Sequence, residues 1–259
     1  MNDIELGGDV YRNYCDMWRT VGALADPGSI FEVEQRVDML LVKSHYGQRV
    51  PHMVLDPRVV PGNERAWASA LIQEWAGEPV SLMVGIPPGA ERGELVKALY
   101  ADGFVQGVRP SVAMARRASP VFDFRDDVDI ELTSSLQDLD DARVILGKVF
   151  GLPSEIFGFY TPVPAVRTYI LRERGIGVAA ACLCPFAGVA GIYSVGVLPN
   201  YRGRGYAQRL VLRLLSDAGN LELTTAVLSC EKSLVPLYRR LGFTTCCELT
   251  TYWMEAWWR

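Results

Sequence analysis

Apolar residues at helical spacing open the chain, and strand-like apolar runs follow. Val10, Tyr14, Met17, Val21 and Leu24 predict an amphipathic helix, which the Asp-Pro-Gly breaker at 26–28 ends. We then expect, in order, strands over 30–46 and 52–55, a helix over 65–76, a strand over 80–86, a helix over 91–102, a left-handed Gly103 and a strand over 104–114. This part alternates between helix and strand.

The C-terminal part starts with hairpin signals and continues with crossover signals. We expect a connection over 116–129, a strand over 130–132, a helix through 139–149, strands over 166–172, 177–184 and 190–198, a helix over 205–218, a strand over 223–228, a helix over 234–241 and a strand over 244–254. The order predicts a mixed α/β (α+β) sheet. We place one domain at 1–120 and a second at 128–259.

The composition excludes several protein classes. The 259 residues, 49% of them hydrophobic, suit one large domain or two modest ones. A formal net charge of −4 argues against nucleic-acid partners, because no excess of Lys and Arg is available for phosphates. No signal peptide precedes the first helix and no apolar stretch is long enough to cross a bilayer, so we expect a cytoplasmic protein without membrane partners.

The six cysteines do not predict a metal site. They form no Cys-x-x-Cys pair, and His45 and His52 are the only histidines. We expect reduced thiols, mostly buried, and no metal. The cysteines are Cys15, Cys182, Cys184, Cys230, Cys246 and Cys247.

Residues 195–207, Val-Gly-Val-Leu-Pro-Asn-Tyr-Arg-Gly-Arg-Gly-Tyr-Ala, place a glycine-rich turn between a strand and a helix. Gly203 and Gly205 lack a Cβ, so the backbone there approaches a ligand closely. Their N–H groups, with those of Arg204, Tyr206 and Ala207, meet at a helix N-terminus and predict a pyrophosphate site. Arg202 and Arg204 add charge-assisted contacts.

Three other interpretations of this turn are weaker. An ordinary strand–turn–helix corner also uses two glycines. A P-loop requires Gly-Lys-Ser/Thr, and a dinucleotide fingerprint requires three spaced glycines with an acid on the next strand. Neither of these two patterns is present.

The segment resembles the pyrophosphate loop of the GNAT acetyltransferase superfamily, Val-x-Pro-x-x-Arg-Gly-x-Gly-x-Ala, at Val197, Pro199, Arg202, Gly203, Gly205 and Ala207. A second family feature, Leu-Tyr-Arg-Arg-Leu-Gly-Phe at 237–243, lies downstream at the expected distance. The resemblance covers residues 130 to the C-terminus. It implies the GNAT fold and acetyl-CoA as co-substrate.

The resemblance also implies roles for individual residues. A bulge should separate the strand before the loop from its neighbour, with the amide of Val195 facing the acyl carbonyl and the backbone of Val197 pairing with the pantetheine arm. Such an amide suits the oxyanion of acyl transfer. Tyr238 should protonate the leaving thiolate. Its alternative is a core tyrosine that anchors a helix.

The general base is not assigned. Gly191 stands where the family often carries a carboxylate, and Glu231 stands where it commonly has Asn. Tyr193, Tyr160 and Glu231 are candidates for the acceptor side, though packing or solvation explains each of them better. An amine that arrives partly deprotonated needs no strong base.

The first half contains a weak echo of the second. Residues 99–104, Leu-Tyr-Ala-Asp-Gly-Phe, resemble 237–243, but the nearest glycine-rich segment, 86–93, contains Pro88 and Glu91, which suit pyrophosphate poorly. We therefore expect a tandem protein with a degenerate GNAT-like N-terminal domain that does not bind CoA. This domain forms either one wall of the acceptor cleft or a purely structural unit.

The leading hypothesis is an N-acetyltransferase that moves acetyl from acetyl-CoA to a primary amine of a small molecule. One alternative is a non-catalytic acyl-CoA sensor, which the glycine at 191 favours. The other keeps the fold but uses a longer acyl chain or a hydroxyl acceptor. The aromatic segment 252–258 packs on the sheet edge, lines the acceptor pocket or contacts a second subunit, so a homodimer stays open.

Overall fold

The computed structural model describes residues 3–24, 29–46, 50–90, 93–108, 110–117, 129–160 and 163–254. The helices are α1 (Asp3–Leu24), α2 (Glu64–Glu74), α3 (Glu94–Ala101), α4 (Leu136–Phe150), α5 (Tyr206–Asn220) and α6 (Val235–Arg240), with short 3-10 turns η2 (Ser154–Tyr160), η3 (Pro199–Tyr201) and η4 (Lys232–Leu234). The strands are β1 (Phe31–Gln35), β2 (Leu40–Ser44), β3 (His52–Leu55), β4 (Leu82–Gly85), β5 (Val105–Gln106), β6 (Ser111–Arg117), β7 (Asp129–Leu132), β8 (Arg167–Glu173), β9 (Ile176–Phe186), β10 (Val189–Val197), β11 (Thr225–Cys230), β12 (Thr244–Leu249) and β13 (Thr251–Met254). Most predicted elements are present.

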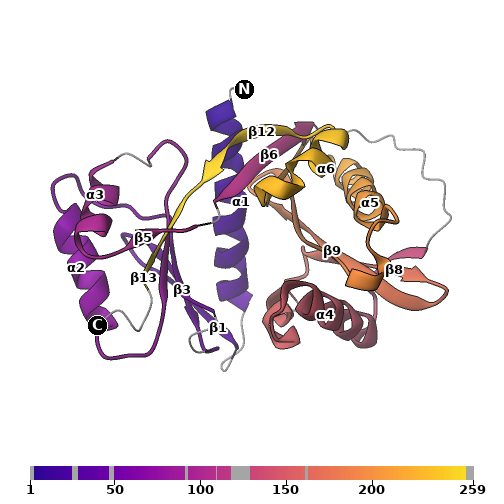
Figure 1. Ribbon diagram of the computed structural model, residues 1–259, viewed down its shortest axis with the longest axis horizontal. Helices are drawn as coiled ribbons and strands as arrows, with labels where there is room; N and C mark the ends of the chain where they lie inside the picture. The colour runs from indigo at the N-terminus through magenta and orange to yellow at the C-terminus, as the bar shows by residue number, and fades with distance from the viewer. Residues whose placement is uncertain are drawn as a thin grey trace.

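Two mixed sheets form the framework (Figure 1). The first sheet has the order β1-β2-β3-β4-β13-β5, and the second has the order β12-β6-β11-β10-β9-β8-β7. Each sheet contains one parallel pair, β3 with β4 and β10 with β11, and the other pairs are antiparallel. The mixed α/β class predicted from the sequence is confirmed.

The two sheets exchange one strand each. Strand β6, from the first half of the chain, lies between β11 and β12 in the second sheet. Strand β13, at the end of the described chain, lies between β4 and β5 in the first. The two halves are therefore interlocked through backbone hydrogen bonds, and the domain division at 120/128 stays a prediction.

Three single strands expected from the sequence are each two strands. The run 104–114 is β5 followed by β6, and 244–254 is β12 followed by β13; both runs pass from one sheet to the other. The run 30–46 is the hairpin β1–β2, closed by a turn in which the Arg36 N–H donates to the Met39 carbonyl at 2.9 Å. Gly107 and Pro110 lie at the break between β5 and β6, whereas neither 36–39 nor 244–254 contains a glycine or proline to mark the other two breaks.

The weak internal echo corresponds to a repeated topology. Each half has a parallel strand pair joined by a crossover helix, α2 or α5, followed by a short helix and a strand that leads into the other sheet. Gly103 and Gly242 end the short helices α3 and α6 with φ of 91° and 83°. These left-handed angles explain why both echo motifs contain a Gly-Phe pair.

Helix α1 lies between the two sheets (Figure 1). It contacts β1 and β2 on one side and β6, β9, β10, β11 and β12 on the other. The outer face of the first sheet is covered by α2 and α3, and the outer face of the second by α5 and α6. Helix α4 shares the inner face of the second sheet with α1. The predicted amphipathic helix is thus buried on two faces.

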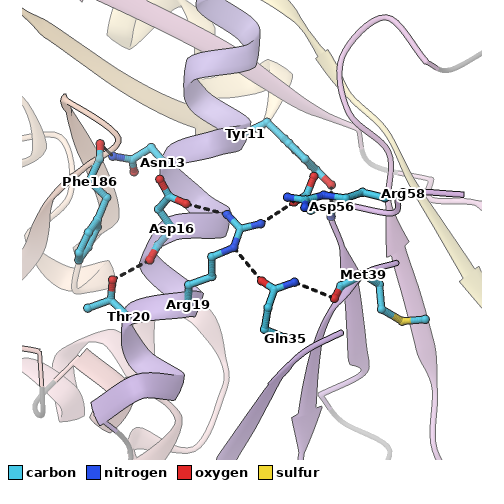
Figure 2. Close-up of polar contacts among 10 residues, drawn as sticks. All are labelled: Tyr11, Asn13, Asp16, Arg19, Thr20, Gln35, Met39, Asp56, Arg58 and Phe186. Atoms are coloured by element: carbon cyan, nitrogen blue, oxygen red, sulfur yellow. Dashed lines mark hydrogen bonds and ion pairs between the residues drawn. The ribbon is translucent and has the colours of Figure 1, made fainter. Parts of the chain in front are cut away.

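Polar side chains fix α1 to both sheets (Figure 2). The fully buried Asn13 amide donates to the carbonyls of Cys184, Phe186 and Val189 at 3.0, 2.8 and 3.2 Å, which ties the helix to the β9–β10 hairpin. On the other side, Arg19 pairs with Asp56, which follows β3. A buried amide with satisfied partners specifies one docking position, since any shift leaves carbonyls unpaired.

We expect Asn13→Ala to lower the free energy of unfolding by about 2 kcal/mol, because three buried carbonyls lose their donor. Chemical denaturation followed by circular dichroism measures this. Arg12→Ala is the matched control on the same helix: its side chain is 65% exposed, so the change should stay within about 0.5 kcal/mol. Equal values for the two variants would refute the role of Asn13.

Candidate functional site

Strands β10 and β11 diverge along their length. They pair only at Ala190 with Ala226 and at Gly191 with Val227, although both strands continue well beyond these residues. Strand β11 stays paired with β6 over its whole length, so the opening is on the β10 side alone. The divergence leaves backbone groups without strand partners in the middle of a sheet, which is the condition for binding an extended ligand.

A bulge in β10 begins where this divergence begins. Tyr193 pairs with Cys182 and Gly196 with Ala180, so Ser194 and Val195 oppose a single residue of β9. Ser194 has a φ of 52°, which is uncommon for a residue with a side chain. The bulge implied by the sequence resemblance is present and contains Val195. The contact of its amide with an acyl carbonyl stays a prediction.

The glycine-rich loop joins β10 to α5 at the open end of this divergence. Gly203 and Gly205 have φ of 77° and 80°, and no atom lies within 4 Å of a Cβ built on either residue. Gly205 is the N-cap of α5, and no side chain caps the helix. The first N–H groups of α5 therefore have no side-chain cap, as an anion site requires.

The two loop arginines are engaged with neighbouring groups. Arg202 Nε donates to the Val197 carbonyl at 3.2 Å. Arg204 pairs with Glu173 at 2.9 Å, and Glu173 also accepts from the Tyr206 hydroxyl at 2.7 Å. The hydrogen bond from Tyr206, followed by the nearby Arg204, lowers the pKa of the Glu173 carboxyl. A phosphate on this loop would compete with Glu173 for Arg204.

Tyr238 lies on α6, on the outer face of the second sheet. It is buried among apolar residues, and its ring makes an edge contact with Phe243 at 6.0 Å between centroids. Burial raises the pKa of the phenol, and the neighbouring Cys230 adds to this shift. Within the described part of the chain its hydroxyl makes no hydrogen bond. It is therefore a protonated and available donor at neutral pH.

A profile of the acetyltransferase (GNAT) family matches residues 152–243. This match covers the bulge, the glycine-rich loop and the Gly-Phe turn described above. Residues 152–243 therefore match a GNAT domain. A comparison with curated protein sequences finds no match.

Solved structures share the fold of the whole chain. A GCN5-related N-acetyltransferase from Kribbella flavida is 17% identical with a TM-score of 0.66, over 95% of this chain and 93% of its own. One from Sphaerobacter thermophilus is 17% identical with a TM-score of 0.63, over 98% and 93%. A tandem GNAT protein from the clavulanic acid biosynthesis pathway is 11% identical with a TM-score of 0.64, over 99% and 97%. The tandem GNAT architecture is thus confirmed.

Within the GNAT domain, the structure explains the glycine at position 191. A Cβ on Gly191 would lie 2.1 Å from the Asn13 side-chain oxygen and 2.6 Å from the Tyr193 ring. That oxygen accepts a hydrogen bond from the Tyr193 hydroxyl at 2.8 Å. The space that a carboxylate would need is therefore filled by α1. Asn13 was missed by sequence reasoning, although a polar residue between Val10 and Met17 on the apolar stripe was a usable signal.

We expect Gly191→Ala to destabilise the protein by about 1–3 kcal/mol, because the methyl group overlaps the Asn13 amide. In an Asn13→Ala background the additional cost should fall to less than half, since the overlapping oxygen is gone. A double-mutant cycle measured by chemical denaturation checks this. Additive effects would show that the Asn13 side chain is not the reason why position 191 requires glycine.

The three candidates for the acceptor side have different positions. Tyr193 lines a cavity between the two halves of the chain. Glu231 is exposed at the start of η4 and does not line that cavity. The Tyr160 side chain lies outside the described residues, as do Glu91 in the first half and the aromatic residues after Met254.

The first half lacks the corresponding opening. Strands β3 and β4 pair at three successive positions, and β2 and β3 pair without a bulge. By topology the counterpart of the GNAT loop is 56–63, after β3, rather than the glycine-rich segment 86–93, which follows β4. In this counterpart Asp56 accepts from Arg19 and Arg58. Its geometry does not reproduce the loop of the GNAT domain.

Three further observations concern only the described residues. None of their helices combines the length and the apolar character needed to cross a membrane. No cluster of three or more His, Cys, Asp or Glu side chains among them could hold a metal ion. None of the six cysteines, all of which the structure describes, forms a disulfide, and four of them are buried.

Proposed function

We propose that the protein transfers an acetyl group from acetyl-CoA to a primary amine of a small molecule in a ternary complex. The observation that carries this proposal is the divergence of β10 and β11 beside the uncapped N-terminus of α5. A pantetheine arm fits between diverging strands, and a pyrophosphate fits the N–H groups of Gly203 to Ala207. The GNAT family of this domain supports the choice of cofactor.

The chemistry uses backbone and side-chain groups of the GNAT domain. The amine lone pair attacks the thioester carbonyl, and the carbonyl oxygen becomes an oxyanion that the Val195 N–H stabilises. The intermediate then collapses: the carbon–sulfur bond breaks, and the CoA thiolate takes the phenolic proton of Tyr238. The new amide nitrogen releases one proton, which returns the phenolate of Tyr238 to its neutral form through water. Acetylated amine and free CoA are the products.

Acetyl-CoA binding tests the cofactor site. In calorimetric titration we expect the wild type to bind acetyl-CoA with a Kd on the order of micromolar, and a Gly203→Glu, Gly205→Glu variant to lose binding, because two carboxylates and two side chains occupy the pyrophosphate position. The matched control is Gly62→Glu, Gly77→Glu. These glycines also have left-handed φ, of 91° and 89°, and open surroundings, so the backbone strain is similar.

The control variant should bind like the wild type, and both variants should keep cooperative thermal unfolding. Equal weakening in the two variants would assign the loss to strain rather than to the loop. A wild type that binds no CoA thioester would remove the transferase proposal.

Tyr238→Phe tests the acid. We expect kcat to fall about 100-fold with an unchanged KM for acetyl-CoA, because the thiolate loses its proton donor. Tyr100→Phe is the control, since Tyr100 occupies the same place in the repeat but is 49% exposed and bonds Gln106 at 3.2 Å. Its kcat should not change. If Tyr238→Phe keeps the wild-type kcat, Tyr238 is not the proton donor and has only a packing role in the core.

The pH profile gives a second test of Tyr238. Burial raises the pKa of its phenol, so the acid stays protonated above the usual tyrosine value. The wild-type kcat should therefore not decline between about pH 8 and about pH 10. A decline in that range that disappears in Tyr238→Phe would contradict this.

A non-catalytic acyl-CoA sensor is the second candidate. It is favoured by the packed Gly191 position, where no carboxylate base fits. Tight acetyl-CoA binding without turnover of any amine would select the sensor. Turnover with longer acyl chains or hydroxyl acceptors would instead widen the substrate range of the transferase.

A further inference from the structure

A cavity of about 240 Å³ lies between the two halves, where the exchanged strands cross. Its walls come from α1, from β3 and β4 of the first sheet, and from β10 and β11 of the second. Ser111, at the start of β6, and Thr250, between β12 and β13, line it at the two crossing points. The cavity follows from the exchange, because the sheets separate where each strand leaves one sheet for the other.

The cavity adjoins the opening described above. Tyr193, at the start of the β10 bulge, and Ser229, near the end of β11, both line it. These residues lie on the two strands that diverge, beyond their last paired positions. The cavity is on the inner face of the second sheet, with α1, whereas Tyr238 and α5 are on the outer face. A thioester reaching through the divergence would meet an acceptor held there.

The lining carries no charge. Most of its surface is apolar, and its polar side-chain groups are hydroxyls from tyrosine, serine and threonine; no acidic, basic or histidine side chain of the described residues contributes. All three tyrosines are already bonded: Tyr11 donates to the Gly85 carbonyl at 2.9 Å, Tyr14 donates to Met53 Sδ at 3.6 Å, and Tyr193 donates to Asn13. A polyamine or an amino acid would leave a buried charge without a counter-ion in this cavity.

We propose that this cavity is the acceptor site, and that the acceptor is a primary amine on an uncharged, apolar body of about one ring. The inference rests on the transferase function proposed above. The volume supports the size: a cavity of about 150 Å³ holds a benzene ring, so about 240 Å³ holds a ring with a short aminoalkyl chain. The first half of the chain is then a wall of the substrate site.

This acceptor chemistry also accounts for the missing carboxylate. Transfer of an ammonium group into an apolar site disfavours its charged form and lowers its pKa, so the amine reaches the thioester neutral. The proton is left in solvent before the reaction rather than on a protein base. The tyrosines facing the cavity, Tyr11, Tyr14 and Tyr193, have pKa values raised by burial and stay neutral phenols.

Binding of amines to the full chain saturated with CoA tests the proposal. The probes are 2-phenylethylamine and 1,4-diaminobutane, measured by calorimetry. We expect the phenyl compound to bind at least about tenfold more tightly, because the second ammonium of the diamine finds no partner. Met83→Trp fills the cavity from β4 and should weaken binding of the phenyl compound about tenfold or more, whereas Met83→Leu, with similar volume, should change it less than about threefold.

Acetyl-CoA binding by the Met83 variants is measured alongside and should equal that of the wild type, since Met83 lies in the first sheet. Equal affinities for the two probes, or wild-type affinity in Met83→Trp, would overturn the acceptor proposal while leaving the transferase function in place. Wild-type protein that binds no acetyl-CoA would remove the transferase function. The amine titration repeated without CoA would then still report whether the cavity selects apolar amines.

Discussion

The reciprocal exchange of β6 and β13 is the constraint on which the rest of the structure depends. Each sheet is completed by a strand from the other half of the chain. Strand β13 joins β4 to β5, and β6 joins β11 to β12. The exchange fixes the separation of the two sheets, and α1 fills the space between them with an apolar surface on both sides. A helix in that position must satisfy its polar groups internally, which Asn13 does through three carbonyls of the β9–β10 hairpin.

Asn13 links the position of α1 to the side chains that surround the β10 bulge. The oxygen of its amide occupies the space beside Gly191 and holds the Tyr193 hydroxyl, so the packing of α1 determines which side chains the start of the β10 bulge can carry. A carboxylate at Gly191 would have to displace a buried, fully bonded amide. The fold thereby excludes a carboxylate at this position and leaves an uncharged cavity beside it.

The sequence predicts the local parts of the site well. Gly203 and Gly205 identify the loop because both positions need left-handed backbone, and the bulge at Val195 follows from the family resemblance. The mixed sheet and nearly every helix follow from apolar periodicity. The exchange does not, because no glycine or proline marks the change of sheet at Leu249, Thr250 and Thr251. The cavity is missed for the same reason: its lining residues come from both halves and meet only through long-range pairing.

The two halves repeat one topology but differ in how their parallel strands pair. This difference decides which half has backbone groups open to a ligand. In the second half, β10 leaves β11 after two pairs, and the backbone groups released there are available to a ligand. In the first half, β3 and β4 stay paired, and the residue after β3, Asp56, binds Arg19 of α1 instead of opening a loop for phosphate. The Asp56 carboxylate after β3 is thus one of the groups that hold α1, together with the carbonyls bonded by Asn13. Because α1 in turn forms a wall of the cavity, the contact of Asp56 with α1 and the cavity between the halves depend on the same helix.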